Sequence, residues 1–324
     1  MTPSRRAFIA AGIAAALASR AAEAQPRKVA RIGYLRLLAF APNDEAFRKG
    51  LRELGYVEGQ NIQVEYRYAG NDIARLAAMA ADLVDAKVEL IVAGGTQAIV
   101  AAKQATATIP IVFPVTFDPV ASGFVASVAR PGGNLTGMDA LNPVVTAKRV
   151  ELLKEVIPGI ARIAVFRNPT NPGSMLALRQ TEVAAKRLGI GLGTLQVQTP
   201  EQLEDAFAAA AKARPDAIMV ISDNFFQTQV RRIVQFAVKL NLPGMFDTRD
   251  FVEAGGLMSY GADLGDLYRR AAGFADKILK GAKPADLPVE QATKFDLVIN
   301  RKTAKALRLT LPQSLLMRAD QIID

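Results

Sequence analysis

Small polar residues follow the apolar runs of this sequence, at positions where a ligand could be held. Gly94, Gly95 and Thr96 come directly after the run 90–93. The two glycines permit close approach of the backbone, and the free amides at a helix start favour an anion such as a carboxylate. Thr96 equally suits a plain helix cap. Asp118, after the run 111–114, could bind an ammonium group or begin a turn before Pro119.

The second half of the chain repeats this arrangement. Asn168 follows the apolar run 162–166, and Ser174 lies where we expect the N-cap of the next helix. Asp223 and Asn224 follow a third run, and two consecutive polar residues before two phenylalanines exceed the needs of a cap, although capping remains open. Asp247 follows the run 244–246. The candidate ligand-binding residues are therefore Gly95, Thr96, Asp118, Asn168, Ser174, Asp223, Asn224 and Asp247.

The composition excludes several kinds of chemistry. The 324 residues contain no His and no Cys, which removes the Ser-His-Asp arrangement, thiol nucleophiles, disulfides, the commonest metal ligands and a lipid-anchored cysteine. We expect no metal, no cofactor and no catalytic residue. The formal net charge is +9, but basic and acidic residues are interspersed, as in 48–53. Without a basic stripe we expect no nucleic-acid binding.

The N-terminus has the pattern of an export signal. Arg5 and Arg6 precede Phe8, an alanine-rich run covers 10–18, and Ala22-Glu23-Ala24 ends the segment. Paired arginines before a short apolar run and an A-x-A end indicate a cleaved signal, residues 1–24, for the twin-arginine export machinery. Nothing after Gln25 has a charge-free apolar run long enough to span a bilayer. We expect a soluble, periplasmic protein.

Short apolar runs alternate with alanine-rich helical stretches along the rest of the chain. This alternation predicts βαβ units and parallel sheets covered on both faces. We expect strands at 29–35, 62–66, 90–93, 111–114, 162–166, 193–196, 217–221, 244–246 and 256–260. We expect helices at 44–54, 74–85, 97–105, 143–156, 175–188, 201–213, 228–240 and 264–279.

The two halves also resemble each other. The run 31–35 is echoed by 162–166, and Ile32 to Val64 has the same spacing as Ile163 to Leu195, 32 residues. Coincidence among generic βα units is the alternative. We expect an α/β protein of two doubly wound parallel-sheet lobes joined by a hinge. Ligands bind beyond the carboxyl ends of such strands, so we expect one cleft between the lobes.

Several ordered segments together carry a family resemblance. They are 54–62, 92–96, 109–113, 118–120, 129–137, 253–261 and 280–290. From about residue 31 to the C-terminus, the chain resembles the ABC-transporter substrate-binding family that includes the tryptophan-binding TrpX-type proteins. The resemblance implies a type I periplasmic-binding-protein fold, with three crossover segments and a ligand held between the lobes on closure.

The resemblance also implies how the chain is divided. We expect lobe 1 to contain 28–141 plus about 257–284, and lobe 2 to contain 142–256 plus about 285–324. The crossovers would lie near Leu141, near 253–260 and near Glu290. The family's cleft positions fall at Thr96, Asp118, Asn168, Asp223 and Asn224. One departure is Arg36 and the bulky residues after it, where members commonly carry small or polar residues. We expect a positive entrance there, which favours an extra carboxylate or an organic acid.

The function implied is that of a solute-binding component of an ABC importer, not an enzyme. Such a protein captures a small polar metabolite, an amino acid or related carboxylate, and delivers it to a permease with its cytoplasmic ATPase. We expect a monomer. One alternative is an exported enzyme that uses Asp118, Asp223 or Asp247 as acid or base. Another is a ligand-sensing module for a membrane receptor.

Overall fold

The protein is described by a computed structural model that covers residues 29–140 and 142–324. The expected export signal, residues 1–24, lies outside the described residues, as does Leu141. Among the helices of the described ranges, none combines the length and the apolar character needed to cross a membrane.

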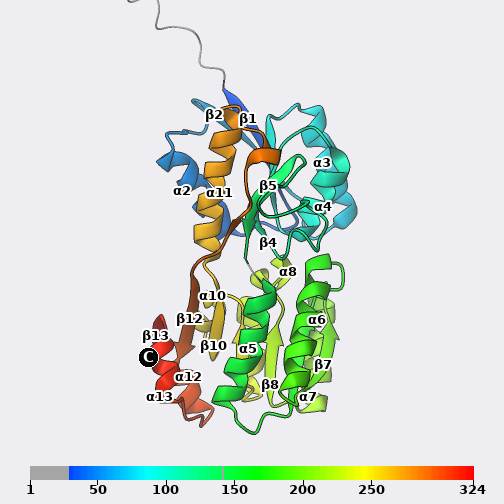
Figure 1. The fold of residues 1–324 in the computed structure, drawn as a ribbon. Coiled ribbons are helices and arrows are strands. Elements are labelled where there is room, and N and C mark those ends of the chain that lie inside the picture. The colour runs from blue at the N-terminus through cyan, green and yellow to red at the C-terminus, as the bar shows by residue number, and fades with distance from the viewer. Residues whose placement is uncertain (1–28, 141) are drawn as a thin grey trace, which may run out of the picture.

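Two α/β lobes are stacked one above the other (Figure 1). Lobe 1 has a six-stranded sheet in the order β11-β5-β4-β3-β1-β2, and lobe 2 a seven-stranded sheet in the order β13-β12-β10-β9-β8-β6-β7. Every neighbouring pair is parallel except β10 with β12. The strands are β1 Ala30–Arg36, β2 Ile62–Tyr68, β3 Leu90–Gly94, β4 Ile111–Thr116, β5 Leu135–Asp139, β6 Arg162–Arg167, β7 Gly191–Gln196, β8 Ala217–Val220, β9 Gly244–Phe246, β10 Met258–Ala262, β11 Glu290–Gln291, β12 Phe295–Asn300 and β13 Gln321–Ile323.

Helices cover both faces of each sheet. They are α2 Ala41–Glu53, α3 Ile73–Asp85, α4 Thr96–Ala105, α5 Asn142–Val156, α6 Pro172–Arg187, α7 Pro200–Ala213, α8 Asn224–Thr228, α9 Val230–Lys239, α10 Arg249–Glu253, α11 Leu264–Leu279, α12 Arg301–Ala306 and α13 Gln313–Arg318. In lobe 1, α2 and α11 lie on one side of the sheet and α3 and α4 on the other (Figure 1).

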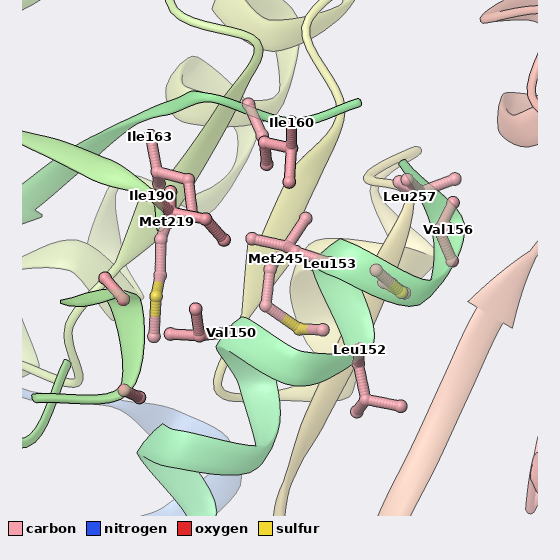
Figure 2. Close-up of a cluster of buried hydrophobic side chains, with 14 of the residues drawn as sticks. Val150, Leu152, Leu153, Val156, Ile160, Ile163, Ile190, Met219, Met245 and Leu257 are labelled. Atoms are coloured by element: carbon pink, nitrogen blue, oxygen red, sulfur yellow. The ribbon is translucent and has the colours of Figure 1, made fainter. Parts of the chain in front are cut away.

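The strand sequences explain why each sheet is buried on both of its faces. In β3, Leu90 and Val92 pack into one cluster, whereas Ile91 and Ala93 pack into the cluster on the opposite face. Successive side chains of a strand point to opposite faces, so a continuous apolar run fits a sheet covered on both sides. In lobe 2, α5 supplies one of these covers, and Figure 2 shows its residues Val150 and Leu153 in the same cluster as Met219 and Met245.

The predicted repeat is confirmed at the level of topology. The order β2-β1-β3-β4 in lobe 1 recurs as β7-β6-β8-β9 in lobe 2. The equal spacing does not extend to the register, however. Ile32 lies opposite Val64 in the sheet, whereas Ile163 lies opposite Leu192. The two α/β lobes of doubly wound parallel strands that we expected are therefore present, with different strand registers.

Two of the expected lobe boundaries are wrong by the length of one strand. We placed 257–284 in lobe 1, but β10 extends the lobe 2 sheet beside β9 and β12, and only the following helix α11 packs on α2 of lobe 1. We placed 285–324 in lobe 2, but β11 pairs with β5 in lobe 1. The chain therefore crosses just after β10 and just after β11. Pairing between strands that are distant in the sequence decides where the chain passes from one lobe to the other. The periodicity of apolar residues gives no information about such pairing.

Several elements were absent from the sequence-based expectation. The strands β5, β11, β12 and β13 and the helices α8, α10, α12 and α13 were not predicted. Most are short, and β5 contains Gly137 at a φ of +151° where a Cβ would lie 2.1 Å from the carbonyl oxygen of Phe113. Close approach of two strands at a glycine leaves little hydrophobic pattern to recognise.

A pair of helical glycines tests the packing of lobe 1. A Cβ on Gly50 in α2 would lie 2.2 Å from the carbonyl oxygen of Arg269, whereas a Cβ on Gly273 in α11 would meet no described atom within 4 Å. We expect Gly50→Ala to lower the free energy of unfolding by about 1–3 kcal/mol through overpacking. We expect Gly273→Ala to raise it by up to about 1 kcal/mol through helix propensity. Denaturant titration measures both, and equal effects of one sign would contradict this packing.

Candidate functional site

A pocket lies between the lobes at the carboxyl ends of their strands, enclosing about 610 Å³ of space, open solvent included. Polar groups from lobe 1 reach it from the start of α4, and polar groups from lobe 2 reach it from the loops after β8 and β9. Its charged lining residues are Arg149, Asp223 and Asp247, all of them from lobe 2. A ligand in this pocket contacts both lobes at once.

Asp223 is the most constrained charged group of the site. Its Oδ1 accepts from Asn168 Nδ2 at 3.0 Å and from the Phe225 backbone N–H at 2.8 Å, so it also caps α8. Its Oδ2 accepts from Asn171 Nδ2 at 2.8 Å and from Gln97 Nε2 at 3.4 Å. All four donors are neutral. Burial raises the pKa of Asp223, and the hydrogen bonds oppose that shift. A nearby positive charge on a ligand would stabilise the ionised form.

Gln97 connects this carboxylate to lobe 1. It belongs to α4, and its amide nitrogen reaches across the cleft to Asp223. Because that nitrogen faces a carboxylate, the carbonyl oxygen is turned elsewhere, and it has no hydrogen-bond partner among the described residues. The carbonyl oxygen of Gln227, which lines the same pocket from lobe 2, is likewise without a partner in that part of the chain. Buried acceptors of this kind are satisfied when a ligand donates to them.

Arg149 supplies positive charge to the pocket. It lies on α5, is 3 % exposed, and donates from Nε to the carbonyl oxygen of Tyr260 at 2.6 Å. Burial lowers the pKa of Arg149, while the nearby carboxylate of Asp247 opposes this effect. Sequence reasoning missed Arg149. The available signal was a cation four residues after Val145 on the buried face of a helix, since residues i and i+4 share a face and both line the pocket.

The wall also has an apolar and aromatic part, beside further polar lining residues, which are Asn43, Asn171, Ser222 and Thr248. Val115, Phe117 and Tyr268 come from lobe 1, and Leu264 lies at the crossover into α11. Val145 faces them from α5 of lobe 2. Burying the hydrocarbon or aromatic part of a ligand against such a wall is favourable, and the few charged groups then fix its orientation.

The structure brings five of the predicted residues to the pocket wall. Gly95, Thr96, Asp223, Asn224 and Asp247 all line it. Gly95 rather than Thr96 is the N-cap of α4, with a φ of +98° that favours glycine. Thr96 is the first residue of the helix, so of the two alternatives for Thr96 the structure excludes the helix cap.

The other three predicted residues do not line the pocket. Asn168 lies behind Asp223 and holds its Oδ1. Ser174 is fully buried within α6, whose N-cap is Asn171 instead. Asp118 begins a turn, with a φ of +55° and its Oδ1 accepting from the Ala121 backbone N–H at 2.9 Å. Asp118 therefore has the turn role that was its alternative, and it is not among the residues that line the pocket.

The expected positive entrance at Arg36 is also absent. Arg36 is fully buried and forms an ion pair with Asp44, whose Oδ1 lies 2.6 Å from Nη1. Asp44 also accepts hydrogen bonds from the hydroxyls of Tyr34 and Tyr68. The guanidinium lies over the ring of Tyr268. Its charge is therefore paired inside lobe 1, and its Nη2 lies 3.5 Å from Oδ1 of Asn224 in lobe 2, so the guanidinium is covered and not exposed at the mouth of the cleft.

Two helix starts face each other beside the pocket. A Cβ on Gly173, in the first turn of α6, would lie 3.0 Å from Thr96 Oγ1 in the first turn of α4. Helix N-termini carry unpaired backbone N–H groups and the positive end of the helix dipole. In α6, however, Pro172 has no N–H, and the N–H groups of Gly173 and Ser174 already donate to Asn171, so the start of α4 is the better placed of the two for an anionic group.

Comparison with known proteins places this geometry in a family. The model of the ABC transporter substrate binding protein family matches residues 39–323. A tyrosine-binding protein from Clostridioides difficile (strain R20291) is 28 % identical over 284 residues, covering 87 % of this chain and 81 % of the relative.

Solved structures of similar proteins superpose on most of this chain. One, from Streptococcus pneumoniae and in complex with L-Trp, is 29 % identical with a TM-score of 0.84, covering 91 % of this chain and 99 % of that one. A ligand-free, open substrate-binding protein from Clostridium difficile is 26 % identical, with the same coverage and a TM-score of 0.64. The lobes of the present chain are thus placed more as in the liganded relative. Because the family model matches most of its length and the fold has two lobes around a pocket, the chain belongs to the ABC transporter substrate-binding proteins.

Proposed function

We propose that this protein captures an α-amino acid with a bulky apolar or aromatic side chain between its lobes and delivers it to an ABC permease with its cytoplasmic ATPase. The observation that carries the proposal is the buried carboxylate of Asp223, held by neutral donors beside the unpartnered carbonyl oxygen of Gln97 in the described chain. This combination of acceptors suits a ligand that brings positive charge and N–H donors.

The charge of the pocket supports an ammonium group. Two of its charged lining residues, Asp223 and Asp247, are acidic and one, Arg149, is basic. A buried excess of one negative charge is costly unless a ligand compensates it. The carbonyl oxygens of Gln97 and Gln227 add acceptors on both sides of the cleft. A primary ammonium, with three N–H donors, matches this set better than a neutral or anionic group.

The opposite end of the ligand would be the carboxylate. Its proposed seat lies at the start of α4, where Thr96 and the backbone amides after Gly95 line the pocket. A ligand carrying both groups therefore neutralises both ends of the site. The side chain would pack against Phe117, Tyr268 and Leu264. Relatives that are named tyrosine-binding or solved with L-Trp support this aromatic class.

The organic-acid alternative loses its support. It depended on a positive entrance at Arg36, and that guanidinium is paired with Asp44 inside lobe 1.

A further part of the proposal concerns export and oligomeric state. We propose that residues 1–24 direct the chain through the twin-arginine export machinery to the periplasm, and that it works there as a monomer. The order of charges and small residues in 4–24 supports the export proposal.

Replacing the proposed ammonium partner tests the ligand class. Asp223→Asn keeps a residue that caps helices well, so we expect α8 and the fold to persist. A hydrogen bond to a charged group contributes about 1.5–3 kcal/mol, so the affinity for L-Trp or L-Tyr should fall about tenfold to a hundredfold or more. The matched control is Glu204→Gln, an exposed carboxylate on α7. Calorimetry measures both, and an unchanged affinity of Asp223→Asn would contradict the assignment.

The pH dependence of binding gives a second test of Asp223. Its pKa in the ligand-free protein is raised by burial, and an ammonium ligand favours the ionised form. Affinity should therefore weaken as the pH falls from about 7 towards the carboxyl range near about 4. Binding in that range should release protons, which calorimetry detects as a dependence of the binding enthalpy on the buffer. The Asp223→Asn variant should lack this proton release, and its persistence would assign it to another group.

The export proposal has its own test. Changing Arg5 and Arg6 together to Lys should leave precursor in the cytoplasm, because the twin-arginine route recognises the pair. Fractionation of cells and immunoblotting measure the distribution. Normal periplasmic accumulation of the double variant would contradict the twin-arginine route, while ligand binding by the purified protein would be unaffected.

A further inference from the structure

The lobes meet at a second place, outside the ligand pocket. Asn71, in the loop after β2 of lobe 1, donates from Nδ2 to the carbonyl oxygen of Gln198 in lobe 2 at 2.8 Å. Leu38, also of lobe 1, packs against the buried cluster of lobe 2 that contains Phe225 and Phe226. None of Leu38, Asn71 and Gln198 lines the pocket. We call these three residues the rim contact.

The rim contact lies far from the segments that join the lobes. Asn71 and Gln198 follow β2 and β7, which are edge strands of their sheets, and Leu38 follows β1 beside β2. The described crossings follow β10 and β11, near the opposite edge of the lobe 1 sheet. A rotation about segments at one side of a cleft separates the other side most. The rim contact therefore breaks early when the lobes open, whereas contacts beside the crossovers change less.

Both sides of the rim contact are fixed by their own lobes. In lobe 1, the Asn71 backbone N–H donates to the Leu37 carbonyl oxygen at 3.1 Å, which joins the two loops that carry Leu38 and Asn71. In lobe 2, the Gln198 backbone N–H donates to Gln202 Oε1 at 2.9 Å, and Thr199 caps α7. Because the groups are held in place before the lobes meet, little conformational entropy is lost when they come together.

We propose that the rim contact is a latch that stabilises the closed state by the same amount whichever ligand occupies the pocket. Leu38, Asn71 and Gln198 are positioning residues: they set affinity and residence time, and leave the choice of ligand to the pocket. A contact made only in the closed state shifts the equilibrium between open and closed lobes. Since it touches no ligand, it changes the dissociation constants of different ligands by one common factor. Only the choice of probe ligands rests on the proposed function.

Asn71→Gly tests the latch without straining the backbone. Asn71 has a φ of +71°, which glycine adopts readily, so the substitution removes the side chain alone. Asn241→Gly is the matched control, because Asn241 also has a positive φ, +52°, and lies in an exposed turn. A second variant, Asn71→Asp, keeps the side-chain size but replaces the N–H donor by an oxygen that faces the Gln198 carbonyl.

The expected effect is the loss of about one neutral hydrogen bond. Stopped-flow dissociation of L-Trp and of L-Tyr should be about fivefold faster in Asn71→Gly than in the parent, and faster still in Asn71→Asp. The ratio of the two dissociation constants should stay unchanged. The Asn241→Gly control should match the parent in both measurements. A changed ratio in Asn71→Gly would place Asn71 in ligand recognition and overturn the proposal.

A measurement without ligand separates this proposal from the proposed function. The chain contains no cysteine, so Asp82→Cys in lobe 1 and Glu182→Cys in lobe 2 carry the only two spin labels. Pulsed electron resonance should show a larger open population in ligand-free Asn71→Gly than in Asn241→Gly. Identical distance distributions would overturn the latch. Failure of the parent to bind either amino acid would contradict the proposed ligand class, and the distance comparison would still decide the latch.

Discussion

A carboxylate buried between two lobes is the constraint on which the site depends. Asp223 belongs to lobe 2, and three of its four hydrogen-bond donors come from that lobe. The fourth is Gln97 of lobe 1. Because the bond from Gln97 joins the two lobes, opening of the lobes would break it and let water reach that side of the carboxylate. Closure is therefore coupled to whatever replaces the water, and a ligand ammonium replaces it better than the neutral amide of Gln97 does.

The fold supplies this coupling through ordinary features of parallel sheets. Strand ends from both lobes face one cleft, so loops and helix starts converge there without special structure. Gly95 permits the closest approach, since a Cβ at that position would lie 2.3 Å from Nδ2 of Asn224 in lobe 2. Asn224 in turn donates to the carbonyl oxygen of Gly94 at 3.3 Å. The pocket binds the ligand, and contacts such as these and the rim contact stabilise the closed arrangement around it.

The sequence predicted the parts of this picture that depend on local pattern. Apolar runs alternating with helices indicated the two lobes, and the polar residues after β8 indicated Asp223 and Asn224. Features that depend on long-range packing were not predictable in this way. The strand β10 joins lobe 2 through pairing with β9 and β12, and Arg36 is neutralised by Asp44, eight residues away on a helix. Gln97 lies inside a helix, where nothing local distinguishes a ligand contact from a solvated side chain, and for Arg149 the one local signal was its place four residues after Val145.

The most direct test of the account is a crystal structure of the protein with the amino acid it retains on purification, identified by native mass spectrometry. The account predicts a zwitterionic ligand between the lobes, with its ammonium nitrogen within hydrogen-bond distance of Asp223 or Gln97. Its carboxylate should lie towards the start of α4. A ligand that contacts only one lobe, or one whose anionic end faces Asp223, would contradict the account.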